Sequence, residues 1–591
     1  MKKQLHFTAI FIFILLGLNT YSNSQTLNCI WANSSQQGIL GGLNVVYSMA
    51  TDANGNTYIT GTFSSDTIMF GSIMLLKKDT TTSTSDYFIA KYDNSGNVLW
   101  AQSAGGTGYG HGLSNEDVGN GITIDNTGNI YATGSFTTDS ITFGNTTLTN
   151  ASNINTSNYF IVKYSPSGKV IWANEGYKNF NNSSAAAITS DNEANIYLIG
   201  SFLINSQSDT IKIGNSNIGG SGYFIAKFDS SGNVIWAKGA SGGIQYVSTC
   251  SGTALTTDVN GNVTVIGGFV GDTVSFGGVK LTNDSSTYID QMFIVKYNSS
   301  GTVLWAKSAN IGTDGIGGFN GITDGGANSI STDTQGALYI TGGFFGSYIT
   351  FGNITLKNHQ LGNSDNMFIV KYSLSGNVVW AKNGAADYIT EGLGIANDDN
   401  GHLYVTGTFD SQILTLGNIR LTGTSANNVF LAKYDTSGNA LAGISTGGSG
   451  YEIDRGVAVQ TDGDGNIYTT GIYSDALSFG NNHLSTVPQG VFVAKFNNTS
   501  GIQGLGTLNS AMKVYPNPTD NSTTVDFTAN DKSVSIAVVN ILGQPVYSEI
   551  ITASNGNNYH ANLNLSSLPA GIYECVIHTS SQNLTQEIFK Q

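Results

Sequence analysis

Charged residues are scarce in this 591-residue chain, at 11% of the sequence, and basic ones are the scarcer kind, with 24 Lys and Arg against 39 Asp and Glu. A formal net charge of −15 argues against binding to nucleic acid, which requires clustered cations along a phosphate backbone. The three cysteines, Cys29, Cys250 and Cys575, lie too far apart to build a disulfide framework or a zinc site. Proline occurs only six times, while the 75 glycines lack the three-residue period of collagen.

Aromatic and apolar residues, by contrast, are plentiful. The chain holds 28 Tyr and 28 Phe, and 40% of its residues are hydrophobic. Bulk disorder is therefore excluded, because disordered chains are poor in aromatic residues and rich in charge. The length corresponds to about four average domains and supports a large buried core.

The N-terminus has the three parts of an export signal. Lys2 and Lys3 precede an apolar run over residues 7–18, and Ser22 and Ser24 supply small residues before a cleavage point. The apolar run is too short to cross a bilayer, and no other segment approaches the required length. We predict a signal peptide over residues 1–24 and a secreted mature chain.

A motif of the form Tyr-x-x-Gly-x-Phe recurs seven times, with a mean period of about 68 residues. Its glycines are Gly61, Gly134, Gly200, Gly267, Gly342, Gly407 and Gly471. An aspartate stands nine residues before each glycine, at Asp52, Asp125, Asp191, Asp258, Asp333, Asp398 and Asp462. A lysine follows each motif, at Lys91, Lys163, Lys227, Lys296, Lys371, Lys433 and Lys495. Trp-Ala pairs close five of the repeats, and one more precedes the first repeat, at Trp31.

Each repeat contains two hairpins, because short β-rich runs flank an Asp-x-x-Gly-Asn turn and a Ser-Gly-Asn turn. A further segment, such as residues 141–148, predicts a small extra hairpin between them. A four-stranded sheet repeated seven times indicates an all-β, seven-bladed β-propeller, since radial stacking covers both apolar faces of every sheet. Trp31 then belongs to a strand that completes the blade begun near Gly456 and closes the ring. An open solenoid is the alternative architecture.

The repeat resembles the SBBP-type β-propeller repeats of secreted and surface bacterial proteins. The resemblance rests on Asp-x-x-Gly-Asn-x-Tyr-x-x-Gly-x-Phe followed by Phe-Ile-x-Lys-Tyr and Trp-Ala, and it covers residues 27–506 of a predicted propeller domain over 25–506. Ala194 replaces a turn glycine, Thr264 replaces a motif tyrosine, and Leu441 stands in place of a tryptophan. The family has no assigned enzymatic activity, so the resemblance implies a fold and no reaction.

After a linker over 507–512 the repeat pattern stops. Residues 513–591 contain short strand-like runs separated by turn signals, which predicts a small Ig-like β-sandwich. Segments 515–518, 540–546, 568–573 and 587–590 resemble the C-terminal sorting domain of type IX secretion substrates in the Bacteroidetes lineage. The resemblance implies that residues 513–591 engage the type IX secretion machinery, and that the protein is secreted or displayed at the outer-membrane surface.

The repeated Asp and Lys residues predict seven ion pairs, because a lysine inside a buried strand requires a counter-charge. Each pair would tie the first hairpin of a repeat to its third strand. Asp462 and Asp464 place oxygen donors at alternate positions of one turn, which leaves calcium binding as an alternative to turn capping there. No other cofactor is expected.

Long connections between repeats are expected on one side of the ring, where loops on a rigid scaffold carry function. Their aromatic and acidic residues suit a glycan or a basic protein segment, and packing between blades is the alternative role. The candidate ligand-binding residues are Tyr109, Tyr177, Tyr246, Tyr388, Tyr451, Glu391 and Glu452, accompanied by Glu116, Asp117 and Asp454.

We therefore expect an exported, non-enzymatic binding or adhesion scaffold that is monomeric and has no transmembrane span. No Gly-x-Ser-x-Gly nucleophile motif joins a strand to a helix, and no catalytic residue is predicted. A polysaccharide-active glycoside hydrolase or lyase is the alternative function. A purely structural surface-layer component is a third.

Overall fold

The computed structural model describes residues 26–37, 42–79, 84–106, 115–150, 157–176, 183–202, 210–220, 222–242, 250–283, 291–312, 325–358, 365–424, 427–448, 454–499, 512–528, 533–540, 544–552, 558–578 and 583–591. Every regular element in them is a β-strand. Within these ranges, no helix has the length and apolar character needed to cross a membrane. The chain divides into two compact units, one of residues 27–498 and one that holds residues 499–591.

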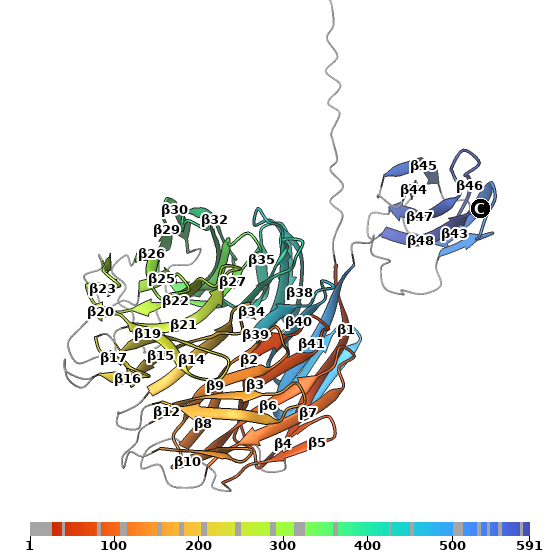
Figure 1. Ribbon diagram of the computed structural model, residues 1–591. Helices are drawn as coiled ribbons and strands as arrows, with labels where there is room; N and C mark the ends of the chain where they lie inside the picture. Colours follow the sequence, from red (N-terminus) through yellow and green to blue (C-terminus); the bar gives the residue numbers. More distant parts are fainter. Residues whose placement is uncertain are drawn as a thin grey trace, which may run out of the picture. The chain divides into compact units, whose positions relative to one another are not determined.

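In the larger unit, four antiparallel strands form a sheet that recurs seven times around a common centre (Figure 1). The first strands are β2 (Asn44–Thr51), β8 (Asn115–Ile124), β14 (Ser183–Ser190), β21 (Cys250–Thr257), β27 (Gly325–Thr332), β33 (Thr390–Asn397) and β39 (Arg455–Thr461). The second strands are β3 (Thr57–Phe63), β9 (Ile130–Phe136), β15 (Ile196–Phe202), β22 (Val263–Phe269), β28 (Leu338–Phe345), β34 (Leu403–Phe409) and β40 (Ile467–Phe479).

The third and fourth strands complete each sheet. The third strands are β6 (Thr84–Tyr92), β12 (Asn158–Tyr164), β18 (Tyr223–Phe228), β25 (Gln291–Tyr297), β31 (Asp365–Tyr372), β37 (Asn428–Tyr434) and β41 (Asn482–Thr499). The fourth strands are β7 (Val98–Ala104), β13 (Val170–Glu175), β19 (Val234–Gly239), β26 (Val303–Gly312), β32 (Val378–Asn383), β38 (Ala440–Thr446) and, for the last sheet, β1 (Thr26–Gln37). Second and third strands such as β3 and β6 are buried along their whole length, because neighbouring sheets cover both of their faces.

The N-terminal strand closes the ring. β1 lies between β41 of the last sheet and β4 of the first, as predicted for the strand around Trp31 (Figure 1). Val46 and Met49 of the first sheet also share one core with Tyr468 and Ile472 of the last. The two ends of the repeat array therefore pack together, which excludes the open solenoid.

An additional two-stranded hairpin, here called the brace hairpin, follows the second strand of every sheet, as predicted. In the last sheet it is continuous with β40 and β41, where residues 476–479 pair with residues 482–485. In the other six sheets it is a separate pair of strands. These hairpins are β4 (Thr67–Phe70) with β5 (Ile73–Leu76), β10 (Ser140–Phe143) with β11 (Thr146–Thr149), β16 (Ile211–Ile213) with β17 (Ser216–Ile218), β23 (Thr273–Phe276) with β24 (Val279–Thr282), β29 (Tyr348–Phe351) with β30 (Ile354–Lys357), and β35 (Ile413–Leu416) with β36 (Ile419–Thr422). Several pair with the end of the preceding repeat: β1 with β4, β20 (Ser241–Gly242) with β23, and β26 with β29. These three brace hairpins therefore join neighbouring sheets by backbone hydrogen bonds.

The C-terminal unit is a small β-sandwich. One sheet contains β42 (Met512–Tyr515), β43 (Ser522–Thr528) and β46 (Asn558–Asn564). The other contains β45 (Pro545–Thr552), β44 (Ser533–Val539), β47 (Gly571–His578) and β48 (Asn583–Lys590). Val525, Ile536, Leu563 and Ile577 meet in the core between the two sheets. The prediction of an all-β chain with a propeller-like body and a C-terminal sandwich is confirmed.

Candidate functional site

The repeated aspartates cap the first turn of each sheet. The Asp125 carboxylate accepts hydrogen bonds from the backbone N–H groups of Thr127 (3.0 Å) and Asn129 (2.9 Å). It also accepts from the Asn129 amide (2.9 Å) and the Tyr131 hydroxyl (3.0 Å). Burial acts to raise the pKa of Asp125, but these hydrogen bonds lower it below its usual value. The backbone cap recurs at Asp52, Asp191, Asp258, Asp333, Asp398 and Asp462.

The repeated lysines form the predicted ion pair at two of the seven positions. Lys227 Nζ lies 3.4 Å from Asp191 Oδ2, and Lys296 Nζ lies 2.8 Å from Asp258 Oδ2. The prediction needs correction at Lys91, Lys163, Lys371, Lys433 and Lys495, which form no ion pair with the repeated aspartates among the described residues. Their amines lie 4.7–5.7 Å from the centre of a tyrosine ring, as the Lys227 amine also does at 4.9 Å. Thr264 replaces this tyrosine beside Lys296, and the shorter ion pair forms there.

The repeated tryptophans tie six of the seven sheets to the next one, and the sixth sheet has Ala442, rather than the expected Leu441, at this position. Trp100 Nε1 donates a hydrogen bond to the carbonyl of Pro166 (3.3 Å), which also accepts from Lys91 Nζ (3.3 Å). The same donation to a turn carbonyl of the following sheet occurs from Trp31, Trp172, Trp236, Trp305 and Trp380. The residues that the seven repeats share therefore hold the ring together and leave ligand binding to other positions.

The turn at Asp462 and Asp464, the candidate calcium position, is capped in the same way as the equivalent turns of the other six sheets. Asp462 accepts from the backbone N–H groups of Asp464 (3.0 Å) and Asn466 (2.9 Å), the Asn466 amide (2.8 Å) and the Tyr468 hydroxyl (3.0 Å). Its two oxygens are thus engaged by neutral donors, while the Asp464 side chain faces solvent. Across the described part of the chain, no cluster of three or more His, Cys, Asp or Glu side chains could hold a metal ion.

Two of the predicted ligand-binding residues lie within the described ranges. Tyr388 is 62% exposed, while Glu391 is half-buried at the start of β33. Burial raises the pKa of Glu391, and the Arg455 charge opposes this effect. The other five, Tyr109, Tyr177, Tyr246, Tyr451 and Glu452, lie outside the described residues.

Two accompanying acidic residues hold loops in place. Asp117 is buried and accepts hydrogen bonds from the Gly106 N–H (3.0 Å) and the Thr138 hydroxyl (2.9 Å). Asp454 is buried likewise and accepts from the N–H groups of Gly448 (2.6 Å) and Ser474 (2.9 Å). Burial raises the pKa of Asp117 to about 7 and that of Asp454 to about 6. Both carboxyl groups anchor connections between sheets and do not line the cavity.

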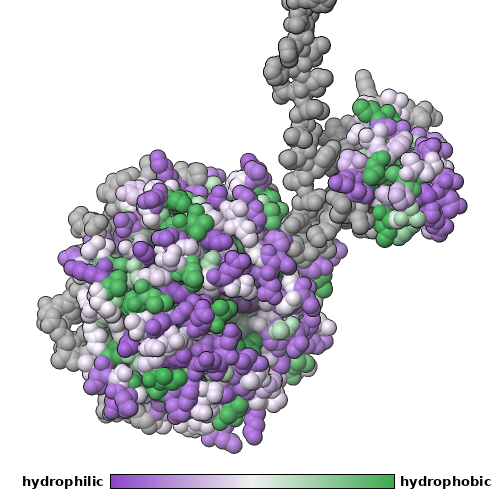
Figure 2. Space-filling model, turned by 45° about the horizontal axis from the view of Figure 1, so that its top comes forward, coloured by the Kyte–Doolittle hydropathy of each residue, from purple (hydrophilic) through white to green (hydrophobic). Residues whose placement is uncertain are grey.

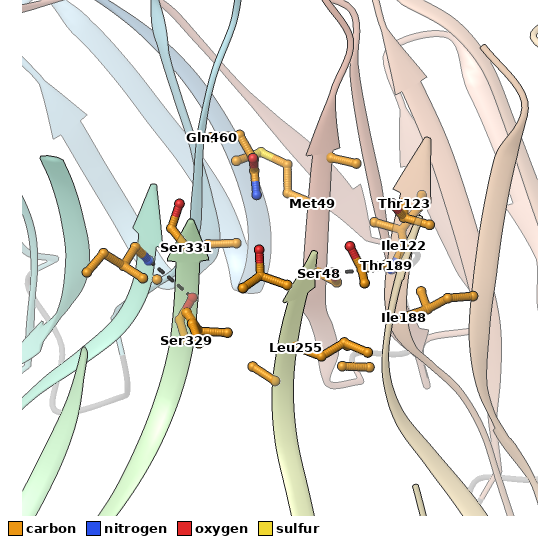
Figure 3. Close-up of a pocket in the computed structure, with 18 of the residues that line it drawn as sticks. Ser48, Met49, Ile122, Thr123, Ile188, Thr189, Leu255, Ser329, Ser331 and Gln460 are labelled. Carbon is orange, nitrogen blue, oxygen red and sulfur yellow. Dashed lines mark hydrogen bonds between the residues drawn. The ribbon is translucent and has the colours of Figure 1, made fainter. Parts of the chain in front are cut away.

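A cavity of about 390 Å³ lies at the centre of the ring, lined by the first strands of all seven sheets. Hydroxyl and amide side chains such as Ser48, Thr189, Ser331 and Gln460 alternate with aliphatic ones on its wall (Figure 3). The outer surface is different, because apolar residues on the face shown in Figure 2 form small groups separated by polar ones. The cavity is therefore a candidate site to which all seven sheets contribute side chains.

Each first strand has a β-bulge at the cavity wall. The bulged residue lies fourteen positions before the repeated glycine and differs from sheet to sheet. The seven residues, here called the bulge ring, are Tyr47, Asn120, Ala186, Thr253, Asn328, Leu393 and Val457, and all of them line the cavity. Bulges re-aim side chains and are common beside functional sites.

Three members of the bulge ring donate hydrogen bonds to the first strand of the next sheet. Asn120 donates to the carbonyl of Ala185 (2.8 Å), Thr253 to that of Ala327 (2.6 Å), and Asn328 to that of Gly392 (3.1 Å). These hydrogen bonds fix the orientation of the polar side chains. Sequence reasoning missed the bulge ring, although aligning the seven repeats on their glycines places its variable residues in one column.

The cavity wall is electrically neutral. Among the described residues that line it there is no Asp, Glu, Lys, Arg or His, and Tyr47 is the one titratable side chain. Tyr47 is 44% exposed. Burial, and then the nearby Glu116 carboxylate, raises its pKa. The wall can therefore bind through hydrogen bonds and apolar contact, without charge.

Comparisons with known proteins agree with a repeat architecture. The chain is 24% identical over 518 residues to an uncharacterized WD repeat-containing protein of Acanthamoeba polyphaga mimivirus, in a match that covers 74% of this chain and 36% of that protein. The chain thus spans about a third of the length of this relative. The SBBP assignment itself stays a prediction.

Solved structures resemble the chain at low identity. A DUF4221 family member from Bacteroides vulgatus shares 12% identity at a TM-score of 0.27, covering 65% of this chain and 93% of that one. PorZ, a surface component of the type IX secretion system of Porphyromonas gingivalis, shares 10% at a TM-score of 0.18, covering 92% and 81%. The rhamnogalacturonan lyase YesX shares 11% at a TM-score of 0.26, covering 96% and 89%. TM-scores this low carry no argument about function.

The C-terminal unit gives a more specific match. Residues 513–591 match the family model of the secretion system C-terminal sorting domain. This sorting domain directs the protein through type IX secretion to the cell surface or the surrounding medium.

Proposed function

We propose that this chain is a non-enzymatic binding scaffold, exported by type IX secretion, whose ligand is a glycan or a protein segment held at the central cavity. The observation that carries the proposal is the neutral cavity wall, to which all seven sheets contribute hydroxyl, amide and aliphatic side chains. Such a wall, concave and mostly preformed with a few oriented polar groups, is typical of binding sites.

The side chains of the same wall argue against the glycoside hydrolase and lyase alternatives. Glycoside hydrolysis requires two carboxyl groups about 5–9.5 Å apart across the scissile bond. The described residues that line the cavity include no carboxyl group, and Asp117 and Asp454 are occupied as loop anchors. A lyase acting on acidic sugars requires a base beside a group that stabilises negative charge, and on the described wall Tyr47 stands without a Lys, Arg or His next to it.

Binding and cleavage can be measured on the same sample. The full exported chain is incubated with neutral polysaccharides, acidic polysaccharides and extracellular matrix proteins. Interferometry measures binding, and assays of reducing ends and unsaturated ends measure cleavage. Saturable binding without product is the expected result. Product from any polysaccharide, or no binding to any member of the panel, would overturn the proposal.

A further inference from the structure

The bulge ring has two chemically different arcs. Leu393, Val457 and Tyr47 come from the sixth, seventh and first sheets, which are neighbours because β1 closes the ring. These three side chains form an apolar arc of the wall. Asn120, Thr253 and Asn328 come from the second, fourth and fifth sheets and form a polar arc, with Ala186 between the first two.

The chemical difference between the two arcs is informative because the seven repeats have similar residues at their other recurring positions. The aspartates, tryptophans and second-strand glycines recur since every sheet needs the same turn and the same seam. The bulge ring repeats its backbone geometry without repeating its chemistry. A position that needs only packing would accept one small residue in all seven repeats. The divergence therefore points to a ligand that contacts each arc differently.

A sugar ring fits this combination of surfaces. A pyranose presents C–H groups on its faces, which pack on an aromatic or aliphatic wall, and hydroxyl groups at its rim, which hydrogen-bond to amides and hydroxyls. The described residues of the wall include no cation to pair with a uronate, and Glu116 near Tyr47 adds negative charge. The cavity volume of about 390 Å³ is at the low end of the range for small-molecule binding sites. A cavity of this size can hold the terminal sugars of a carbohydrate chain.

We propose that the bulge ring binds the end of a neutral carbohydrate chain, with Tyr47 as the stacking platform and Asn120, Thr253 and Asn328 as hydrogen-bonding partners. This inference rests on the proposed binding function and names its ligand class. Uncharged oligosaccharides are bound, whereas polyuronates are excluded by charge.

The test uses the full exported chain and calorimetric titration with named probes. The neutral probes are cellotetraose, maltotetraose, mannotetraose and xylotetraose, and tetragalacturonic acid is the acidic probe. We expect binding of at least one neutral probe and none of the acidic one. Tyr47→Ala should weaken that binding about tenfold, whereas Tyr47→Phe, which keeps the ring, should stay within about threefold of the wild type.

Tyr348→Ala is the matched control, because Tyr348 on β29 is an exposed tyrosine outside the cavity wall. It should leave binding unchanged, and thermal melts of all variants should coincide with the wild type. If Tyr47→Ala fails to fold, the less disruptive Leu393→Asn, which places a polar group in the apolar arc, replaces it and should also weaken binding.

Two kinds of failure are distinguishable. Neutral sugar binding that survives Tyr47→Ala and Leu393→Asn, or binding of tetragalacturonic acid alone, would overturn the bulge-ring site and leave the scaffold function standing. Binding of matrix proteins without any sugar would do the same. Release of new reducing ends from a neutral probe would overturn the scaffold function as well.

Discussion

Ala194 occupies a turn position that favours glycine. Its φ is 59°, in the left-handed region, where the six sister turns have glycines with φ between 69° and 82°. Ala194→Gly removes the strained Cβ and should raise the free energy of unfolding by about 0.5–1 kcal/mol, seen as a higher urea midpoint at unchanged slope. Gly128→Ala, whose Cβ would approach no atom closer than 3.5 Å, is the reciprocal control and should destabilise. Equal stability of Ala194→Gly and wild type would contradict this prediction.

Asp86 carries a carboxyl group where sister repeats have an amide. It lies opposite Phe63, and the equivalent positions hold Asn158, Asn366 and Asn428. Burial raises the pKa of Asp86 to about 7. The folded state therefore binds a proton that the unfolded state has released between about pH 4 and 7, so this residue makes the protein less stable as the pH rises through that window.

Asp86→Asn should remove the Asp86 contribution to this pH dependence, whereas those of Asp117 and Asp454, whose pKa values burial also raises, should remain. At pH 8 we expect the variant to be about 2 kcal/mol more stable than the wild type, with the difference shrinking toward pH 4. Urea unfolding at half-unit pH steps measures the effect. Asp93→Asn is the control. Asp93 caps a turn, and although desolvation acts to raise its pKa, its hydrogen bonds lower the pKa below the usual value. A parallel pH profile for Asp86→Asn and wild type would disprove the assignment.

Among the elements, β1 has the most distinctive role, because it is the one fourth strand supplied from the other end of the propeller array. Trp31 Nε1 donates to the carbonyl of Asn94 (3.0 Å), and its ring packs edge-on against Tyr468 at 6.3 Å. Asn33 Nδ2 donates to the carbonyl of Gly96 (2.7 Å). β1 thereby supplies the seam between the last sheet and the first.

Trp31→Ala should lower stability by about 2–3 kcal/mol and expose β1 to limited proteolysis, since non-covalent contacts hold this strand. Trp172→Ala is the matched control, because its hydrogen bond to Ser230 (3.3 Å) has the same chemistry in a sheet whose strands follow one another in sequence. It should lose similar stability without releasing its strand to the protease. Cleavage of both strands at equal rates would contradict the special role of β1.

At the scale of the whole molecule, the two units have separate cores. The core of residues 525–588 contains no residue of the propeller clusters. Deletion of residues 513–591 should therefore leave the unfolding midpoint of the propeller unchanged and abolish export, since the sorting domain is lost. Cell fractionation measures export, and circular dichroism of the purified truncated chain measures folding. Export at the wild-type level after the deletion would contradict the assignment.

Local patterns in the sequence determined most of the architecture. The strands, the turns and the brace hairpins follow from short-range rules, because alternation and turn chemistry act within a few residues. Recurrence of Asp, Gly and Trp then implied stacked sheets, and the surplus Trp31 implied closure of the ring. The sorting domain was likewise predictable, since its motifs lie together at the C-terminus.

Tertiary structure decided what those residues contact. The sequence predicted Asp–Lys pairs within each repeat, yet neutral donors cap the Asp125 carboxylate, and Lys91 also reaches Pro166 of the following sheet. The bulge ring, too, gathers Tyr47, Leu393 and Val457 from distant repeats. Sequence spacing fixes the period of the sheets, but their radial stacking decides which side chains meet across a seam or face a shared cavity.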